Sequence, residues 1–210
     1  MSAKVLGIFS KGETIKYISH LDFSSAIHRF VRMSGLDIAF SQGYNPKAKI
    51  SFLTAVSTGV AFDQDPVLLH LNTLVDPVDV FSRLNKVLPS DIVLKSVHTY
   101  CGSKLPRILK STYVVKTRRE IPSDRIREYN QMEKIVLQDR RQREIDLKQS
   151  VEKIISEGKT EITYTVQHGE NCLLASPLDI LSFLMNKRVL NSSGIRIVIT
   201  RRELSGSIGY

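Results

Sequence analysis

The apolar residues of the segment 20–33 recur every three or four positions: Phe23, Ala26, Ile27, Phe30 and Val31. This spacing places them on one face and predicts an amphipathic helix that packs on a core. Ser19 precedes the pattern and Asp22 follows three residues later, a spacing that resembles a capping box with Asp in place of Glu. Gly35 is typical of a residue that ends a helix.

The rest of the first half predicts short strands and a second helix. Apolar runs indicate strands at 4–9, 36–41, 67–71 and 92–99, with 48–62 extended around a break near residues 57–59. Lys11, Gly12 and Glu13 predict a turn. Asp76-Pro77 predicts a helix start, because proline is favoured in the first turn, and Pro89 predicts its end. The order strand, helix, strand, strand, helix, strand is typical of a ferredoxin-like domain.

The second half repeats this order less regularly. Strands are predicted at 112–117, 159–167 and 195–200, and extended or mixed structure at 134–137 and 145–155. One helix is predicted to begin at Pro122-Ser123-Asp124 and run to about Met132, and the last helix begins at Ser176-Pro177. We therefore expect an α+β fold of two tandem ferredoxin-like (βαββαβ) halves, the second irregular. The expected boundaries are an N-terminal domain at 1–100, a linker at 101–110 and a basic C-terminal domain at 111–210.

Charge indicates the class of partner. The 210 residues carry 30 Lys and Arg against 21 Asp and Glu, a formal net charge of +9. Residues 1–104 contribute 11 − 8 = +3, and the remainder contributes 19 − 13 = +6. A basic surface attracts polyanions, of which nucleic acid is the commonest. A generic basic protein is the alternative interpretation.

Cysteine content and hydropathy limit the function classes. Cys101 and Cys172 are too few for a disulfide framework, and an iron–sulfur cluster needs about four cysteine ligands. The chain has no leading apolar segment and no apolar run of the roughly 18 residues that span a bilayer. We therefore expect a cytoplasmic protein that has no membrane association and holds no cofactor or cluster itself.

The predicted first helix carries a polar face. His20, Ser24, His28 and Arg32 follow one another at intervals of four residues. An imidazole is able to act as a general acid or base near neutral pH, and His with Arg is suited to phosphate. A solvated polar face is the alternative, and His28 is interpreted as a surface residue. The histidines lack the spacing of metal ligands, so no metal site is expected.

A polar loop follows this helix. Residues 41–49 combine a flexible glycine, a turn-forming Asn-Pro pair, an aromatic ring and two lysines: Ser41, Gln42, Gly43, Tyr44, Asn45, Pro46, Lys47 and Lys49. Backbone N–H groups of such a loop bind anions, tyrosine stacks on bases and lysines contact phosphates. A plain connecting loop is the alternative. We expect the loop and the first helix to meet in one positively charged recess.

The segment 104–153 holds many cations interleaved with acids, which is also typical of an exposed charged face. Arg118-Arg119 and Arg140-Arg141 are the better phosphate-contact candidates because each pair concentrates charge, and Arg201-Arg202 is similar. Contacts to phosphates supply affinity without sequence preference.

Several motifs together resemble one family. They are Tyr17–Phe23 (YISHLDF), Arg29 and Arg32, Phe40–Pro46 (FSQGYNP), Ile50–Phe52, Leu84-Asn85, Leu88-Pro89, Arg143–Leu147 and Ser176–Asp179. The pattern resembles the radical SAM-linked domain of unknown function, DUF2344. Ser176 departs from the arginine of the family's Arg-Pro-x-Asp turn. The resemblance implies an accessory module fused to or encoded beside a cobalamin-type radical SAM protein, with S-adenosylmethionine and the iron–sulfur cluster on that partner.

Three functional hypotheses follow. The first is a non-catalytic RNA-binding or substrate-presenting partner of a radical SAM enzyme, with contacts from Arg29, Arg32, Gln42, Gly43, Tyr44, Asn45, Lys47, Lys49, Arg118 and Arg119. The second is a metal-independent RNA endonuclease, with His20 as general acid or base and Arg32 or Lys49 stabilising the developing charge. The third is a protein-only adaptor that docks through residues 118–153.

Overall fold

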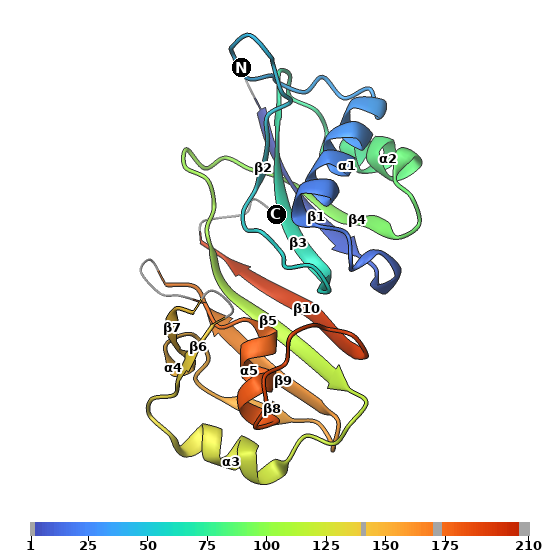
Figure 1. Ribbon diagram of the computed structural model, residues 1–210. Helices are drawn as coiled ribbons and strands as arrows, with labels where there is room; N and C mark the ends of the chain where they lie inside the picture. Colours follow the sequence, from blue (N-terminus) through green and yellow to red (C-terminus); the bar gives the residue numbers. More distant parts are fainter. Residues whose placement is uncertain (1–2, 140–141, 170–173, 206–210) are drawn as a thin grey trace. The chain divides into compact units, whose positions relative to one another are not determined.

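The computed structural model describes residues 3–139, 142–169 and 174–205 (Figure 1). The chain forms two compact units. Unit 1 contains the described residues up to Arg107 together with Ser205, and unit 2 runs from Ile108 to Leu204. Both units combine helices with antiparallel strands, which confirms the predicted α+β class.

Unit 1 has the predicted order of elements. They are β1 (Ala3–Lys11), a 3₁₀ turn η1 (Glu13–Ile15), α1 (His20–Met33), β2 (Ile50–Phe52), β3 (Ala61–Leu71), α2 (Pro77–Val87) and β4 (Ile92–Thr99). The strand order is β4-β1-β3-β2, and every neighbouring pair is antiparallel. The two helices contact each other and lie together beside the sheet (Figure 1).

The apolar face of α1 is buried as its spacing predicts. Phe23, Ile27 and Val31 are almost fully buried. The Phe23 ring packs edge-to-face against Phe62 of β3 at 5.3 Å between centroids and lies 6.3 Å from Phe52 of β2. Burial of such aromatic side chains is the main favourable contribution that holds a helix on a sheet.

Two local predictions for unit 1 are wrong. Residues 36–41 form no named strand and make only isolated bridges, at Ile38 and Phe40. These residues form an irregular connection instead, in which Ile38 and Ala39 are buried and Phe40 is exposed. Lys11 ends β1 instead of lying in a turn, and it is buried.

Unit 2 contains the remaining elements. They are β5 (Ile108–Thr117), α3 (Ser123–Gln131), β6 (Val136–Gln138), β7 (Glu144–Asp146), α4 (Leu147–Ser150), β8 (Ile154–Ser156), β9 (Glu161–Gln167), α5 (Pro177–Leu184) and β10 (Ile195–Leu204). The strand order β10-β5-β9-β8 is antiparallel, and β6 and β7 form a separate hairpin. The predicted apolar face of β9 is confirmed, because Ile162, Tyr164 and Val166 are buried.

The linker expected at 101–110 overlaps regular structure, since β5 begins at Ile108. The predicted domain boundaries otherwise stay a prediction. None of the helices in the described part of the chain combines the length and apolar character needed to cross a membrane.

Candidate nucleic-acid interface

Local hydrogen bonds fix the two pieces that form the site. Ser19 caps α1, because its Oγ accepts the Asp22 backbone N–H at 3.1 Å. The 41–47 loop closes on itself: the Ser41 N–H donates to the Lys47 carbonyl at 2.8 Å, and the Lys47 N–H donates to Ser41 Oγ at 2.9 Å. Gly43 has φ +137°, a conformation that side-chain-bearing residues rarely adopt. The loop therefore has a defined path that depends on its glycine.

A groove of about 830 Å³ lies between α1 and this loop, and we call it the α1 groove. Its polar lining comes from Ser24, Ser25, His28, Arg29 and Arg32 of α1 and from Asn45 and Lys47 of the loop. Its apolar lining comes from Leu21, Met33, Phe40, Pro46 and Ala48. The structure thus brings the helix and the loop together in one recess, as the sequence predicts.

The α1 groove is positively charged. In the part of the chain that the structure describes, the side chains of Arg29, Arg32 and Lys47 make no ion pair or hydrogen bond, and no carboxylate lines the groove. The two acidic residues nearest in sequence have their own partners: Asp22 accepts from the Ser19 hydroxyl at 2.7 Å, and Asp37 from the Asn72 amide at 2.7 Å. Three cations therefore face solvent uncompensated.

His28 contributes a neutral imidazole to this wall. Burial lowers the pKa of His28 below its usual value, and the positive charge of Lys47 lowers it further. The ring also lies 6.3 Å from Phe52. At pH 7 the positive potential of the groove therefore comes from guanidinium and ammonium groups, and His28 supplies hydrogen-bonding atoms and a flat surface.

The other predicted loop residues lie outside the lining. Gln42, Gly43 and Tyr44 are exposed at the tip of the loop, and the Tyr44 ring is entirely open to solvent. Lys49 lies beside His70, since the Lys49 carbonyl accepts the His70 backbone N–H at 3.1 Å. Burial, then the charge of Lys4 and then that of Lys49 lower the pKa of His70. Lys49 is therefore not part of the α1 groove.

The structure separates His20 from Arg32, one of its two alternative partners in the endonuclease hypothesis. His20 packs edge-on against Phe52 at 5.5 Å and does not line the α1 groove. Arg32 lies twelve residues along the same helix, about 18 Å away at 1.5 Å per residue. Lys49 lies near His70. One phosphate therefore cannot contact both His20 and Arg32, and the pairing of His20 with Lys49 stays a prediction.

Sequence reasoning missed several lining residues. Phe40, Met33 and Leu21 were not candidates, because apolar residues are first assigned to the core. Phe40 stays 46% exposed, Met33 58% and Leu21 77%. Two features of the sequence indicate that these residues are exposed. Leu21 lies on the polar side of α1, and Phe40 comes directly before the polar loop. His28, interpreted as a surface residue, lines the groove.

Arg118 and Arg119 belong to unit 2 and line a different groove, described below. Arg201 and Arg202 lie on β10, where the charge of Arg202, after burial, lowers the pKa of His168. Arg140 and Arg141 lie outside the described residues.

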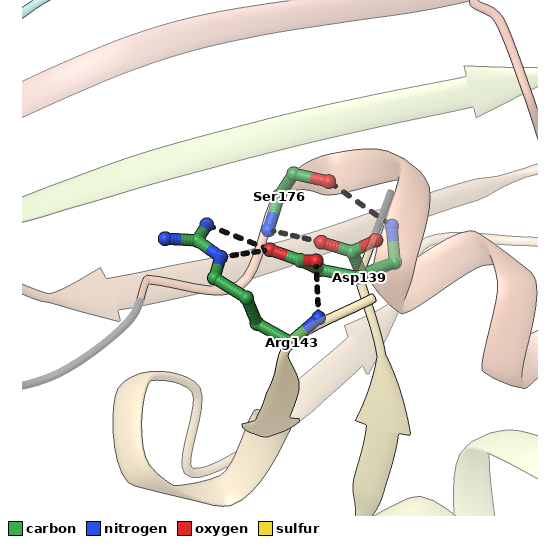
Figure 2. Close-up of polar contacts among 4 residues, drawn as sticks. Asp139, Arg143 and Ser176 are labelled. Carbon is green, nitrogen blue, oxygen red and sulfur yellow. Dashed lines mark hydrogen bonds and ion pairs between the residues drawn. The ribbon is translucent and has the colours of Figure 1, made fainter. Parts of the chain in front are cut away.

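The later sequence motifs have structural roles in unit 2. Asp139 accepts the Arg143 backbone N–H at 3.0 Å and its guanidinium at 2.6 and 2.9 Å, as Figure 2 shows. Ser176 and Asp179 exchange side-chain and backbone hydrogen bonds in a complete capping box at the start of α5 (Figure 2). Ser176 is therefore the N-cap of α5.

No group of three or more His, Cys, Asp or Glu side chains in residues 3–139, 142–169 and 174–205 is placed to hold a metal ion. The expectation that the chain holds no metal or cofactor stays a prediction.

Comparison with known proteins identifies the family. A family model described as an uncharacterized protein conserved in bacteria (DUF2344) matches residues 4–175. The chain belongs to this family. The match covers unit 1 and unit 2 as far as residue 175, and it confirms the resemblance to DUF2344. The radical SAM association is not addressed by this match and stays a prediction.

Among curated proteins, no sequence match to this DUF2344 chain was found. The solved structures that are similar at low identity include the following two. A Cbf5-Nop10-Gar1 complex aligns with a TM-score of 0.45 and 11% identity, over 93% of this chain and 48% of that chain. An H/ACA RNP bound to a substrate RNA aligns with a TM-score of 0.44 and 10% identity, over 95% and 47%. The chain spans about half the length of these solved chains.

Proposed function

We propose that this protein binds single-stranded RNA in the α1 groove as a non-catalytic accessory or substrate-presenting module. The observation that supports this most is the set of three unpaired cations, Arg29, Arg32 and Lys47, around a groove lined by no carboxylate of the described chain. Unpaired Lys and Arg on a groove gain affinity for phosphates through counterion release.

The apolar lining supports a single strand in preference to a duplex. Phe40 and Met33 line the same groove as the cations, and Tyr44 is fully exposed on the adjoining loop. Unstacked bases pack on exposed aromatic rings while their phosphates meet cations, and this combination is typical of single-strand binding. A duplex keeps its bases stacked and offers mainly phosphates.

The fold proposal is that both units are ferredoxin-like. Unit 1 supports it with the order βαββαβ and the sheet order β4-β1-β3-β2. Unit 2 has the equivalent sheet order β10-β5-β9-β8 if the segment from β6 to α4 is treated as an insertion. Tandem domains of this type are compatible with RNA binding, but fold alone does not assign a function.

We propose a radical SAM protein as the partner and the cytoplasm as the location. The family resemblance supports the partner, and two cysteines in the chain are too few to ligate a cluster. Co-purification with a radical SAM protein after nuclease treatment would favour the protein-only adaptor hypothesis. Co-purification that nuclease abolishes supports RNA as the link.

The test measures affinity for an unstructured oligouridylate at two salt concentrations. We expect Arg29→Gln with Lys47→Gln to weaken binding at least fivefold and to reduce the salt dependence of log K by about 1.4, at about 0.7 per lost single-strand contact. Phe40→Ala should weaken binding and leave the salt dependence unchanged, because stacking involves no counterion release.

The control is Lys86→Gln with Lys104→Gln, two exposed cations of unit 1 outside the groove. This variant removes the same charge and should bind like the unmodified protein. Equal losses in both double variants would mean that only net charge matters and would reject the α1 groove as the binding site.

A further inference from the structure

We infer that unit 2 carries a second, separate site for the phosphate backbone of RNA. It is a groove of about 460 Å³ lined by Arg118 and Arg119 after β5 and by Lys187 and Arg188 after α5. We call it the unit 2 groove. It shares no residue with the α1 groove, and the inference stands on its own observations.

The four cations are uncompensated. In the described part of unit 2, the side chains of Arg118, Arg119, Lys187 and Arg188 make no ion pair or hydrogen bond, and no acidic residue lines the groove. Glu120, the acidic residue next to the arginine pair, is bound to Lys159 at 3.0 Å. Like charges that line one groove repel one another, so a bound anion lowers the energy of the arrangement.

The segment that carries Lys187 and Arg188 is held in place. Ser182 of α5 accepts the Val189 backbone N–H at 2.9 Å and donates to the Leu178 carbonyl at 2.6 Å. At the far end of the segment, Asn191 Oδ1 accepts the Ser193 N–H at 3.0 Å. The cations are therefore presented from a connection with a defined path, which lowers the entropy cost of binding.

Arg118 lies against the backbone at Gly194. This glycine has φ +69°, and a Cβ placed there would lie 3.5 Å from Arg118 Cδ. The Arg118 side chain thus runs along the backbone at the start of β10. Guanidinium groups present paired N–H donors that match phosphate oxygens. Nucleic acid is the commonest polyanion that a basic surface attracts, and we therefore take a phosphodiester backbone as the occupant.

A neighbouring cavity differs from the unit 2 groove in the charges that line it. It shares Lys187, Arg188 and Val189 with the unit 2 groove, but it is also lined by Asp179 and by Arg125, whose guanidinium is paired with Glu128. Charges of both signs are therefore present there. Lys187 and Arg188 also follow the C-terminal end of α5, where the helix dipole stabilises positive charge, so their removal should also lower the stability of the fold. Binding, not stability, must therefore be the readout.

The experiment compares two double variants of the full chain with equal changes. Arg118→Gln with Lys187→Gln removes two cations from the groove. Arg127→Gln with Lys153→Gln removes one exposed arginine and one exposed lysine of unit 2 that do not line it. With oligouridylate as the probe, we expect the groove variant to bind at least fivefold more weakly, with a salt slope smaller by about 1.4, and the control to change less than twofold.

Two outcomes would overturn the inference. One is equal weakening by the groove variant and its control. The other is competition by polyglutamate as effective as by RNA of equal charge, which would assign the groove to acidic peptides. Measuring the Arg29→Gln with Lys47→Gln variant beside the Arg118→Gln with Lys187→Gln variant separates the two proposals. Loss only from the unit 2 pair rejects the α1 groove and keeps this site, and loss only from the α1 pair does the reverse.

Discussion

At the scale of single residues, a lysine is buried in the core of unit 1. Lys11 is only 2% exposed, and its Nζ lies 5.4 Å from the Phe62 ring centroid and 5.9 Å from that of Phe23. Burial lowers the pKa of Lys11 to about 8, and the nearby Asp65 carboxylate offsets part of this shift. The unfolded chain binds this proton more tightly than the folded protein does.

This shift predicts a pH dependence of stability. Between about pH 8 and pH 10.5 the unfolded state holds the Lys11 proton and the folded state releases it, so the free energy of unfolding rises with pH. At about 1.4 kcal/mol per unit of pKa shift, Lys11 should add about 2 kcal/mol between pH 8 and pH 10.

The measurement is urea unfolding at both pH values. Lys11→Met should remove this rise, and the exposed control Lys86→Met should retain it. A rise that is the same in all three proteins would show that Lys11 is not the source.

The candidate site was predictable only in part. The meeting of the first helix with the polar loop follows from their proximity in the chain and from residue types that need water or an anion. Lys49 shows what does not follow, because only the paired register of the strands places it beside His70. Phe40 shows a different difficulty, since a phenylalanine is first assigned to the core and only its position directly before the polar loop indicates that it is exposed.

At the scale of elements, helices were predicted better than strands. The apolar spacing and the capping residues place α1 at His20–Met33 and start α2 at Pro77, as the structure has them. The strand expected at 36–41 failed because short apolar runs suit both strands and buried connections. The segment from β6 to α4 was predicted only as extended or mixed, since its elements are three or four residues long.

The α1 cap gives a prediction at this scale. Ser19→Ala removes the oxygen that accepts the Asp22 N–H and should lower the free energy of unfolding by about 1 kcal/mol. Ser25→Ala, at an exposed position within the same helix, should be neutral or raise stability by up to about 0.5 kcal/mol. Urea denaturation compares the two, and an unchanged midpoint for Ser19→Ala would show that the cap does not stabilise α1.

At the scale of the whole molecule, positive charge occurs on both units. Each unit contains one groove that is lined by unpaired cations and by no carboxylate among the described residues. The two grooves differ in their apolar lining: the α1 groove includes Phe40, whereas no aromatic residue lines the unit 2 groove. We therefore expect bases to be contacted mainly by unit 1 and phosphates by both units.

Residue-resolved NMR during titration with an oligouridylate tests the central claim most directly, namely that RNA lies in the α1 groove. We predict that backbone amide shifts change first in Ser24–Arg32 of α1 and in Asn45–Lys47 of the loop, and that these changes diminish as salt is raised. Shifts that leave both segments unchanged while RNA binds elsewhere would contradict the account.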